Sequence, residues 1–174
     1  MRRNRRTKTS TRNNQSDPTS VDRTHANRRL EGATRDGLLE FWGLEDALIR
    51  GGLADALEAR GMEVQWTCGG WHVERGGKVF ATGPMAMTEN EVVVVSLETT
   101  MRLEWIQSFL TVLSELLDWL PTYRGRKIHG ALAYLDCEDE ARRHAERVGL
   151  FLIRVVEGRA RIENGPGFEP RSFG

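Results

Sequence analysis

The chain has 174 residues, of which 39% are hydrophobic and 29% charged, a composition that allows one packed domain. Lys and Arg total 25 and Asp and Glu total 25, yet residues 1–36 carry ten of the basic and four of the acidic residues. A basic tail therefore precedes an acidic domain. Two cysteines, Cys68 and Cys137, exclude a disulfide scaffold and indicate free thiols in a reducing compartment, so we expect a cytoplasmic protein.

Residues 1–36 are rich in Arg, Asn, Thr and Ser and contain few long apolar side chains, so we expect no secretory signal there. Such a segment cannot bury enough apolar surface to offset the entropy lost on ordering, and we predict a disordered basic tail. Its charge suits contacts with DNA phosphates, and the other interpretation is a solvated tail without a partner. The folded domain is then expected over residues 37–174.

The predicted elements begin with a helix over residues 43–60, where apolar residues recur at helical spacing and Gly61 can end the helix. Residues 62–66 alternate between polar and apolar side chains as a strand does. Two further short strands, 71–74 and 78–81, lie on either side of Arg75-Gly76-Gly77 and predict a hairpin.

Residues 91–98 contain four consecutive valines, which is typical of a strand buried on both faces. A helix over 102–120 follows and is ended by Pro121. Its apolar stripe is wide, so the helix is expected to pack on the sheet. The same width is compatible with a homodimer in which part of the stripe contacts a second copy of the chain. Charged residues interrupt the stripe, which excludes a membrane span.

A strand over 127–135, a helix over 138–148 and two closing strands, 150–156 and 160–163, complete the predicted elements. Strands that alternate with helices late in the chain indicate parallel pairing inside a mixed sheet. The sequence therefore predicts a three-layer α/β fold, in which helices flank a central mixed sheet.

Ser96 and Glu98 share one face of the 91–98 strand, because side chains alternate along a strand. Two neighbouring polar residues at the end of a buried strand indicate a place for a functional site. The other interpretation is that the strand leaves the core at this point.

Four stretches of the chain, residues 75–100, 120–133, 145–151 and 161–173, resemble a group of uncharacterised proteins. These belong to the PD-(D/E)xK, or restriction-endonuclease-like, nuclease superfamily. The resemblance runs from Leu44 to the last residue, and its most specific part is Arg161-Ile-Glu-Asn-Gly-Pro-Gly-Phe-Glu-Pro-Arg-Ser-Phe. The superfamily's order of elements, α-β-β-β-α-β, agrees with the elements predicted above apart from one additional strand before the second helix.

In that superfamily an Asp on one strand and a Glu-x-Lys on the next form a Mg²⁺ site that activates water for phosphodiester hydrolysis. The resemblance places Gly83 at the Asp position, Ser96 at the Glu, Glu98 at the Lys and Glu45 at an assisting Glu of the first helix. The three chief positions are thus substituted, which favours a pseudo-nuclease kept for binding or assembly. The alternative is an active Mg²⁺- or Mn²⁺-dependent DNA phosphodiesterase whose metal ligands are Glu45 and Glu98.

Three other groups of residues are functional candidates. Glu89 and Glu91 are expected in a solvated turn, away from the site. A zinc set of Cys68, His72, Cys137 and His144 has poor spacing, so free thiols are the preferred interpretation. Five tryptophans could stack on bases, but we favour packing in or near the core for them.

Overall fold

The structure is a computed structural model that describes residues 34–174, and the prediction of a disordered tail falls largely on residues outside this range. Six strands form one mixed sheet in the order β1-β4-β5-β6-β7-β8, and two more form a separate hairpin, β2-β3. The chain order is α2 (Arg35–Ala47), a π-helical turn (Leu48–Gly52), α3 (Leu53–Glu58), β1 (Trp66–Cys68), β2 (His72–Arg75), β3 (Lys78–Ala81), β4 (Met85–Met87), β5 (Glu91–Met101), α4 (Leu103–Trp119), a 3₁₀ turn (Pro121–Tyr123), β6 (Lys127–Cys137), α5 (Asp139–Arg147), β7 (Phe151–Val156) and β8 (Arg159–Ile162).

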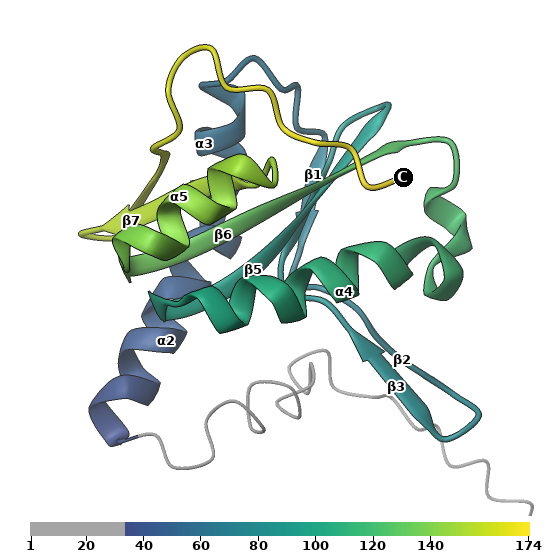
Figure 1. Cartoon of the computed structure of the whole chain (residues 1–174), viewed down its shortest axis with the longest axis horizontal. Coiled ribbons are helices and arrows are strands. Elements are labelled where there is room, and N and C mark those ends of the chain that lie inside the picture. Colours follow the sequence, from purple (N-terminus) through teal and green to yellow (C-terminus); the bar gives the residue numbers. More distant parts are fainter. Residues whose placement is uncertain (1–33) are drawn as a thin grey trace, which may run out of the picture.

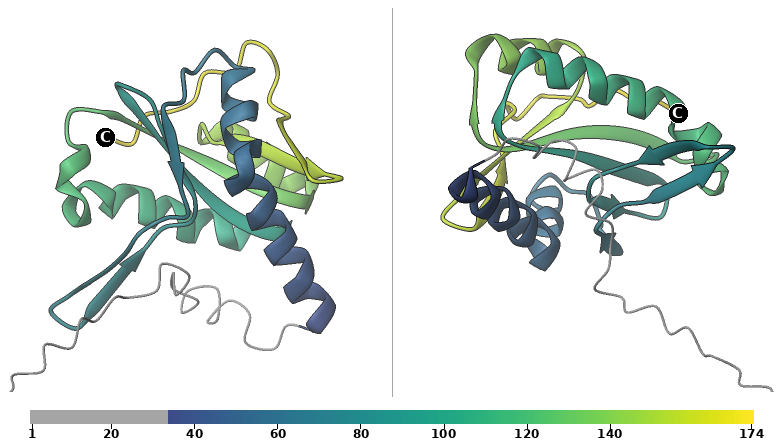
Figure 2. Two further views of the ribbon diagram at one scale, coloured as in Figure 1. Left: turned by 180° about the vertical axis from the view of Figure 1, so that it is seen from behind. Right: turned by 90° about the horizontal axis from the view of Figure 1, so that it is seen from below.

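The three-layer α/β arrangement predicted above is confirmed. Strands β5, β6 and β7 pair in parallel, while β1, β4 and β8 pair antiparallel with their neighbours. Helices α4 and α5 cover one face of the sheet and α2 with α3 covers the other, as the right panel of Figure 2 shows. No helix among residues 34–174 is long and apolar enough to cross a lipid bilayer.

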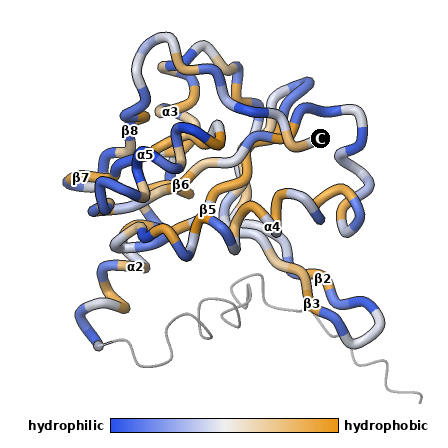
Figure 3. The backbone as a smooth tube through the Cα atoms, viewed as in Figure 1, coloured by the Kyte–Doolittle hydropathy of each residue, from blue (hydrophilic) through white to orange (hydrophobic). Residues whose placement is uncertain are grey.

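The run of valines in β5 is buried on both faces because each face of this strand belongs to a different core. Val92 and Val94 pack with side chains of α4 such as Ile106 and Phe109. Val93 and Val95 pack with Leu44 and other side chains of α2 and α3. Figure 3 shows β5 as mostly hydrophobic and α5, in contrast, as mostly hydrophilic. The alternation of β5 therefore assigns every polar residue on it to one of two separate layers.

The first helix begins at Arg35, eight residues earlier than predicted. The hydroxyl of Thr34 accepts a hydrogen bond from the amide of Gly37 and so caps the helix. The helix is interrupted at Leu48–Gly52, where Gly51 has a non-helical φ of 118° and the chain bends. Beyond this bend the chain is helical again as α3. The left panel of Figure 2 shows α2 and α3 following one another along one side of the body.

The strand predicted over 62–66 is displaced, because the paired segment is β1, at Trp66–Cys68. The short β4 was not predicted, and it lies between β1 and β5 in the sheet.

The predicted β2-β3 hairpin forms, but it projects from the body instead of joining the sheet (Figure 1). Phe80 stacks on Trp119 at the end of α4 with ring centroids 5.5 Å apart, which anchors the base of the hairpin.

Candidate functional site

The β4–β5 junction, which comprises Gly83, Pro84, Val95 and Ser96, is where the resemblance places the superfamily's metal ligands. Met85 pairs with Val94, and the amide of Val95 donates a 2.8 Å hydrogen bond to the carbonyl of Pro84. The antiparallel register thus brings Gly83 beside Ser96, as the superfamily's Asp and Glu would require.

Gly83 lies so close to β5 that it has no room for a side chain. A Cβ atom placed on Gly83 would come closer than 3.0 Å to the backbone carbonyl oxygen of Val95, a separation that real Cβ atoms essentially never show. That oxygen belongs to the backbone of a central strand and cannot rotate away as a side chain could. An aspartate at this position is therefore incompatible with the observed backbone.

Ser96 is buried, with 4% of its surface exposed, and its hydroxyl has no hydrogen-bond partner. It shares the face of Val92 and Val94, which α4 covers. Glu98 follows on the same face and is half-buried near the end of β5, where it pairs in register with Tyr134. Both residues thus belong to the layer between the sheet and α4.

Glu45 lies on α2, which covers the opposite face of the sheet. It is half-buried, and this burial raises the pKa of its carboxyl. The sheet itself therefore separates the helix that carries Glu45 from the face that carries Glu98. Across residues 34–174, no three His, Cys, Asp or Glu side chains form a group that could hold a metal ion. Mg²⁺ needs an octahedral set of oxygen ligands, and a glycine, a buried hydroxyl and two separated carboxylates do not fit that requirement.

A polar row that the sequence analysis missed crosses the same face at the carboxyl ends of the parallel strands. Glu98, Tyr134, Arg154 and Arg161 are direct neighbours on β5, β6, β7 and β8. Direct neighbours in a sheet present their side chains to the same face, so the row lies on the side covered by α4 and α5. No sequence motif joins these residues, since strand register alone brings them together.

Glu163, just after β8, connects this row to α5. Its Oε2 accepts hydrogen bonds from Tyr134 Oη at 3.0 Å and from Arg142 Nη1 at 2.6 Å. Its Oε1 lies 3.6 Å from Arg154 Nη1. Burial acts to raise the pKa of Glu163, but these donors and positive charges act more strongly and hold it below its ordinary value. The pKa of Tyr134 is raised, first by burial and then by the neighbouring charge of Glu163.

Asn164 is buried and ties the closing segment to the sheet. Its side-chain oxygen accepts a 2.7 Å hydrogen bond from the amide of Leu152, and its side-chain nitrogen donates to the carbonyl of Leu150 at 3.3 Å. Arg60 donates to the backbone carbonyls of Asn164 and Gly165. These contacts hold the segment that follows β8 against the sheet. This segment belongs to the stretch 161–173, the most specific part of the resemblance, so part of that stretch has a structural role.

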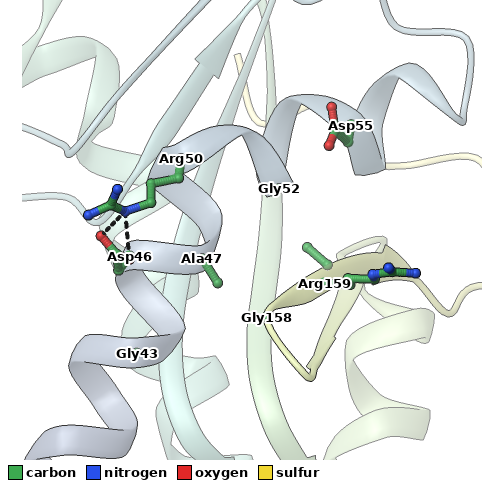
Figure 4. A pocket seen from close by; sticks show the side chains of 9 residues that line it. Gly43, Asp46, Ala47, Arg50, Gly52, Asp55, Gly158 and Arg159 are labelled. Carbon is green, nitrogen blue, oxygen red and sulfur yellow. Dashed lines mark hydrogen bonds and ion pairs between the residues drawn. The ribbon is translucent and has the colours of Figure 1, made fainter.

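A pocket of about 530 Å³ lies between the bend of α2 and α3 and the turn that joins β7 to β8. Asp46 and Arg50 form an ion pair on one wall, with Arg50 Nε 2.6 Å from Asp46 Oδ1 (Figure 4). Asp55 and Arg159 come from the other walls. The two acidic and two basic side chains balance in charge, so the pocket shows no preference for a cation or an anion.

The remaining sequence candidates are dispersed. Cys68 and Cys137 are both free thiols, as predicted. Trp105 and Trp119 pack against the core, in agreement with the preferred interpretation. Trp42, Trp66 and Trp71, in contrast, are between 40% and 48% exposed.

Comparisons with known proteins give little further information. No protein-family model matches the sequence, and no curated protein is a significant match. Among solved structures, the crystal structure of a repair endonuclease from Pyrococcus abyssi is similar over 51% of this chain, with a TM-score of 0.31 and 18% sequence identity. The similar part spans 39% of that endonuclease's own length. A similarity of this size assigns no role to any residue of this chain.

Proposed function

We propose that this chain is a catalytically inactive member of the restriction-endonuclease-like superfamily that acts as a DNA-binding module. The order α2, β1, β4, β5, α4, β6 follows the superfamily's order α-β-β-β-α-β once the projecting β2-β3 hairpin is treated as an insertion. Strands β5 and β6 are parallel and joined by α4, as two strands connected by a helix should be. This topology supports the superfamily assignment.

The observation that carries the inactive assignment is the absence of space at Gly83. Hydrolysis by this superfamily depends on a metal held by two carboxylates across the β4–β5 junction. Here one position cannot accept a Cβ atom, and the other is a buried serine under α4. The scaffold is thus retained while the site is occupied by close backbone packing.

A nuclease assay on plasmid and single-stranded DNA, with Mg²⁺ or Mn²⁺, tests the inactive assignment. We expect no cleavage by the full chain and none by its Glu98→Ala variant. Glu104→Ala is the matched control, since Glu104 is an exposed glutamate on the neighbouring helix α4. Cleavage that EDTA abolishes, that Glu98→Ala loses and that Glu104→Ala keeps would refute the proposal. It would establish the alternative, a phosphodiesterase with a non-standard metal site that uses Glu98.

DNA binding is expected to come from the basic residues among residues 1–36. Residues 37–174 carry fifteen basic and twenty-one acidic residues, and this net negative charge repels DNA. Binding through phosphates releases counterions, so the affinity should fall steeply with salt. Replacing Arg2, Arg3, Arg5 and Arg6 with Gln in the full chain should lower the log–log salt slope by roughly 3 to 4. A parent chain that forms a stable oligomer and binds no DNA at moderate salt would instead identify an assembly domain.

A further inference from the structure

The polar row at the carboxyl ends of the strands contains an unusual pair of like charges. Arg154 on β7 and Arg161 on β8 are directly opposite each other in an antiparallel pair. Side chains in such a pair start about 5 Å apart and project from the same face. Two positive charges in this arrangement repel each other unless an anion lies between them or beside them.

The protein supplies less negative charge here than the arginines require. Glu163 is the adjacent carboxylate, but its Oε2 is already bonded to Tyr134 and Arg142. Its contact with Arg154 is 3.6 Å long, beyond ordinary hydrogen-bond distance. Glu98 stands at the far end of the row, two strands and thus roughly 10 Å away from Arg154.

Both arginines of this pair have unused donors. The Nε atom of Arg154 is buried and has no hydrogen-bond partner. Arg161 is exposed, and its side chain takes part in none of the hydrogen bonds or ion pairs formed within residues 34–174. A buried donor without a partner is unfavourable, so an acceptor that reaches it would be bound favourably.

The location also favours a ligand. In open α/β sheets, ligands bind beside the carboxyl ends of the parallel strands. Tyr134 and Arg154 lie in the second half of β6 and β7, on the face that α5 covers. Arg142 of α5 reaches over the ring of Tyr134, with its guanidinium 5.8 Å from the ring centroid. The arginines thus come from three separate elements and converge on one edge of the sheet.

We infer that Arg154 and Arg161 form a binding site for a phosphate dianion, either free phosphate or a terminal phosphate monoester. The planar guanidinium group donates two parallel hydrogen bonds to phosphate oxygens, and two neighbouring guanidinium groups match two negative charges. The dianion bridges Arg154 and Arg161, while Glu163 keeps Tyr134 and Arg142. This site goes beyond the proposed function, because it involves neither the β4–β5 junction nor the basic N-terminal residues.

Isothermal titration of the full chain with inorganic phosphate tests this site at constant ionic strength. Arg161→Gln should weaken phosphate binding about tenfold or more, the loss expected for one charge-assisted guanidinium pair. Its unfolding midpoint without ligand should equal or exceed that of the parent, since the side chain of Arg161 makes no bond within residues 34–174 and its charge repels Arg154. Lys78→Gln is the control, because it removes the same charge from the projecting β2-β3 hairpin (Figure 1) and should bind phosphate like the parent.

A nucleoside monophosphate and dimethyl phosphate are the second pair of probes. The monophosphate should compete with inorganic phosphate, and whichever of the two binds more tightly identifies the source of the dianion. Dimethyl phosphate carries one charge and should not compete. The site is overturned if the parent does not bind at millimolar phosphate, if Arg161→Gln binds as tightly as Lys78→Gln, or if dimethyl phosphate competes as well as the monophosphate.

Discussion

Substituting Gly83 with Ala is the most direct perturbation of the β4–β5 junction. The added methyl group would approach the carbonyl oxygen of Val95 more closely than 3.0 Å. To relieve this overlap, the chain before β4 must move away from β5. That movement stretches the 2.8 Å hydrogen bond from the amide of Val95 to the carbonyl of Pro84.

The size of the effect follows from these two contacts. Overpacking a close-packed position such as the half-buried Gly83 costs about 1–3 kcal/mol, and a weakened backbone hydrogen bond costs about 1 kcal/mol. Replacing glycine also removes flexibility from the unfolded chain, which returns about 0.4–1 kcal/mol of stability. We therefore expect Gly83→Ala to lower the free energy of unfolding by about 1–3 kcal/mol.

Urea denaturation, followed by tryptophan fluorescence, measures this change. Gly43→Ala is the control, since Gly43 lies inside α2 with no atom within 4 Å of an added Cβ. The control should gain about 0.5–1 kcal/mol, because alanine is the better helix former. Equal stability of Gly83→Ala and the parent would refute the argument that β5 closes the site.

The same overlap applies to an aspartate, which has the same Cβ atom. The triple variant Gly83→Asp, Ser96→Glu, Glu98→Lys restores the superfamily's motif in sequence, yet we expect it to be destabilised and to remain inactive in the nuclease assay. Mg²⁺-dependent cleavage by this variant would show that the backbone at the junction adapts more readily than the structure indicates.

Two further predictions concern buried polar groups. Ser96→Ala should raise the free energy of unfolding, by up to about 1–2 kcal/mol, because it removes a buried hydroxyl that has no partner; a loss of stability in urea denaturation would reveal an unrecognised partner. Glu163→Gln should lower stability at pH 7 by about 1–3 kcal/mol, since it breaks charge-assisted bonds to Arg142 and Tyr134. The pKa of Glu163 is lowered by folding, so its contribution is present above its unfolded pKa of about 4.3 and is lost as the pH falls further. The difference between variant and parent should therefore narrow from pH 7 to about pH 3.5; a difference that stays constant would contradict the charged state assigned to Glu163.

Much of the fold was predictable because it is encoded in local patterns. The four valines of β5 indicated a strand buried on both faces, and both faces are covered by helices. Glycines at positive φ, Gly76 and Gly77, form the turn of the predicted hairpin. Each of these features involves residues close together in the chain, so the sequence pattern is sufficient to predict it.

The elements that were missed depend on contacts between distant parts of the chain. The segment Met85–Met87 shows no alternation, and it becomes a strand because β1 and β5 pair with it on either side. The start of α2 depends on one capping hydroxyl, from Thr34, within a stretch whose composition resembled the tail. The row from Glu98 to Arg161 depends on the register of four strands, which no spacing along the chain specifies.

For the predicted site positions, too, local features were predictable and features that depend on distant contacts were not. Proximity of Gly83 and Ser96 follows from a short antiparallel connection, which a resemblance in sequence can locate. The lack of space at Gly83 could not be predicted, since it arises from the backbone of Val95. The separation of Glu45 from Glu98 likewise depends on which face each helix covers.

The bend between α2 and α3 keeps the buried leucines of both helices on the sheet. Leu44, Leu48, Leu53 and Leu57 are all buried against the sheet, at steps of four, five and four residues. The single longer step coincides with the bend at Leu48–Gly52, where Gly51 has a φ of 118°, outside the helical range. A straight helix repeats its buried face at steps of three and four, so a step of five keeps the leucines on the sheet only because the helix bends there. The direction in which α2 leaves the body is therefore set at Gly51, and a residue that cannot adopt this φ would change that direction although the buried leucines stay the same.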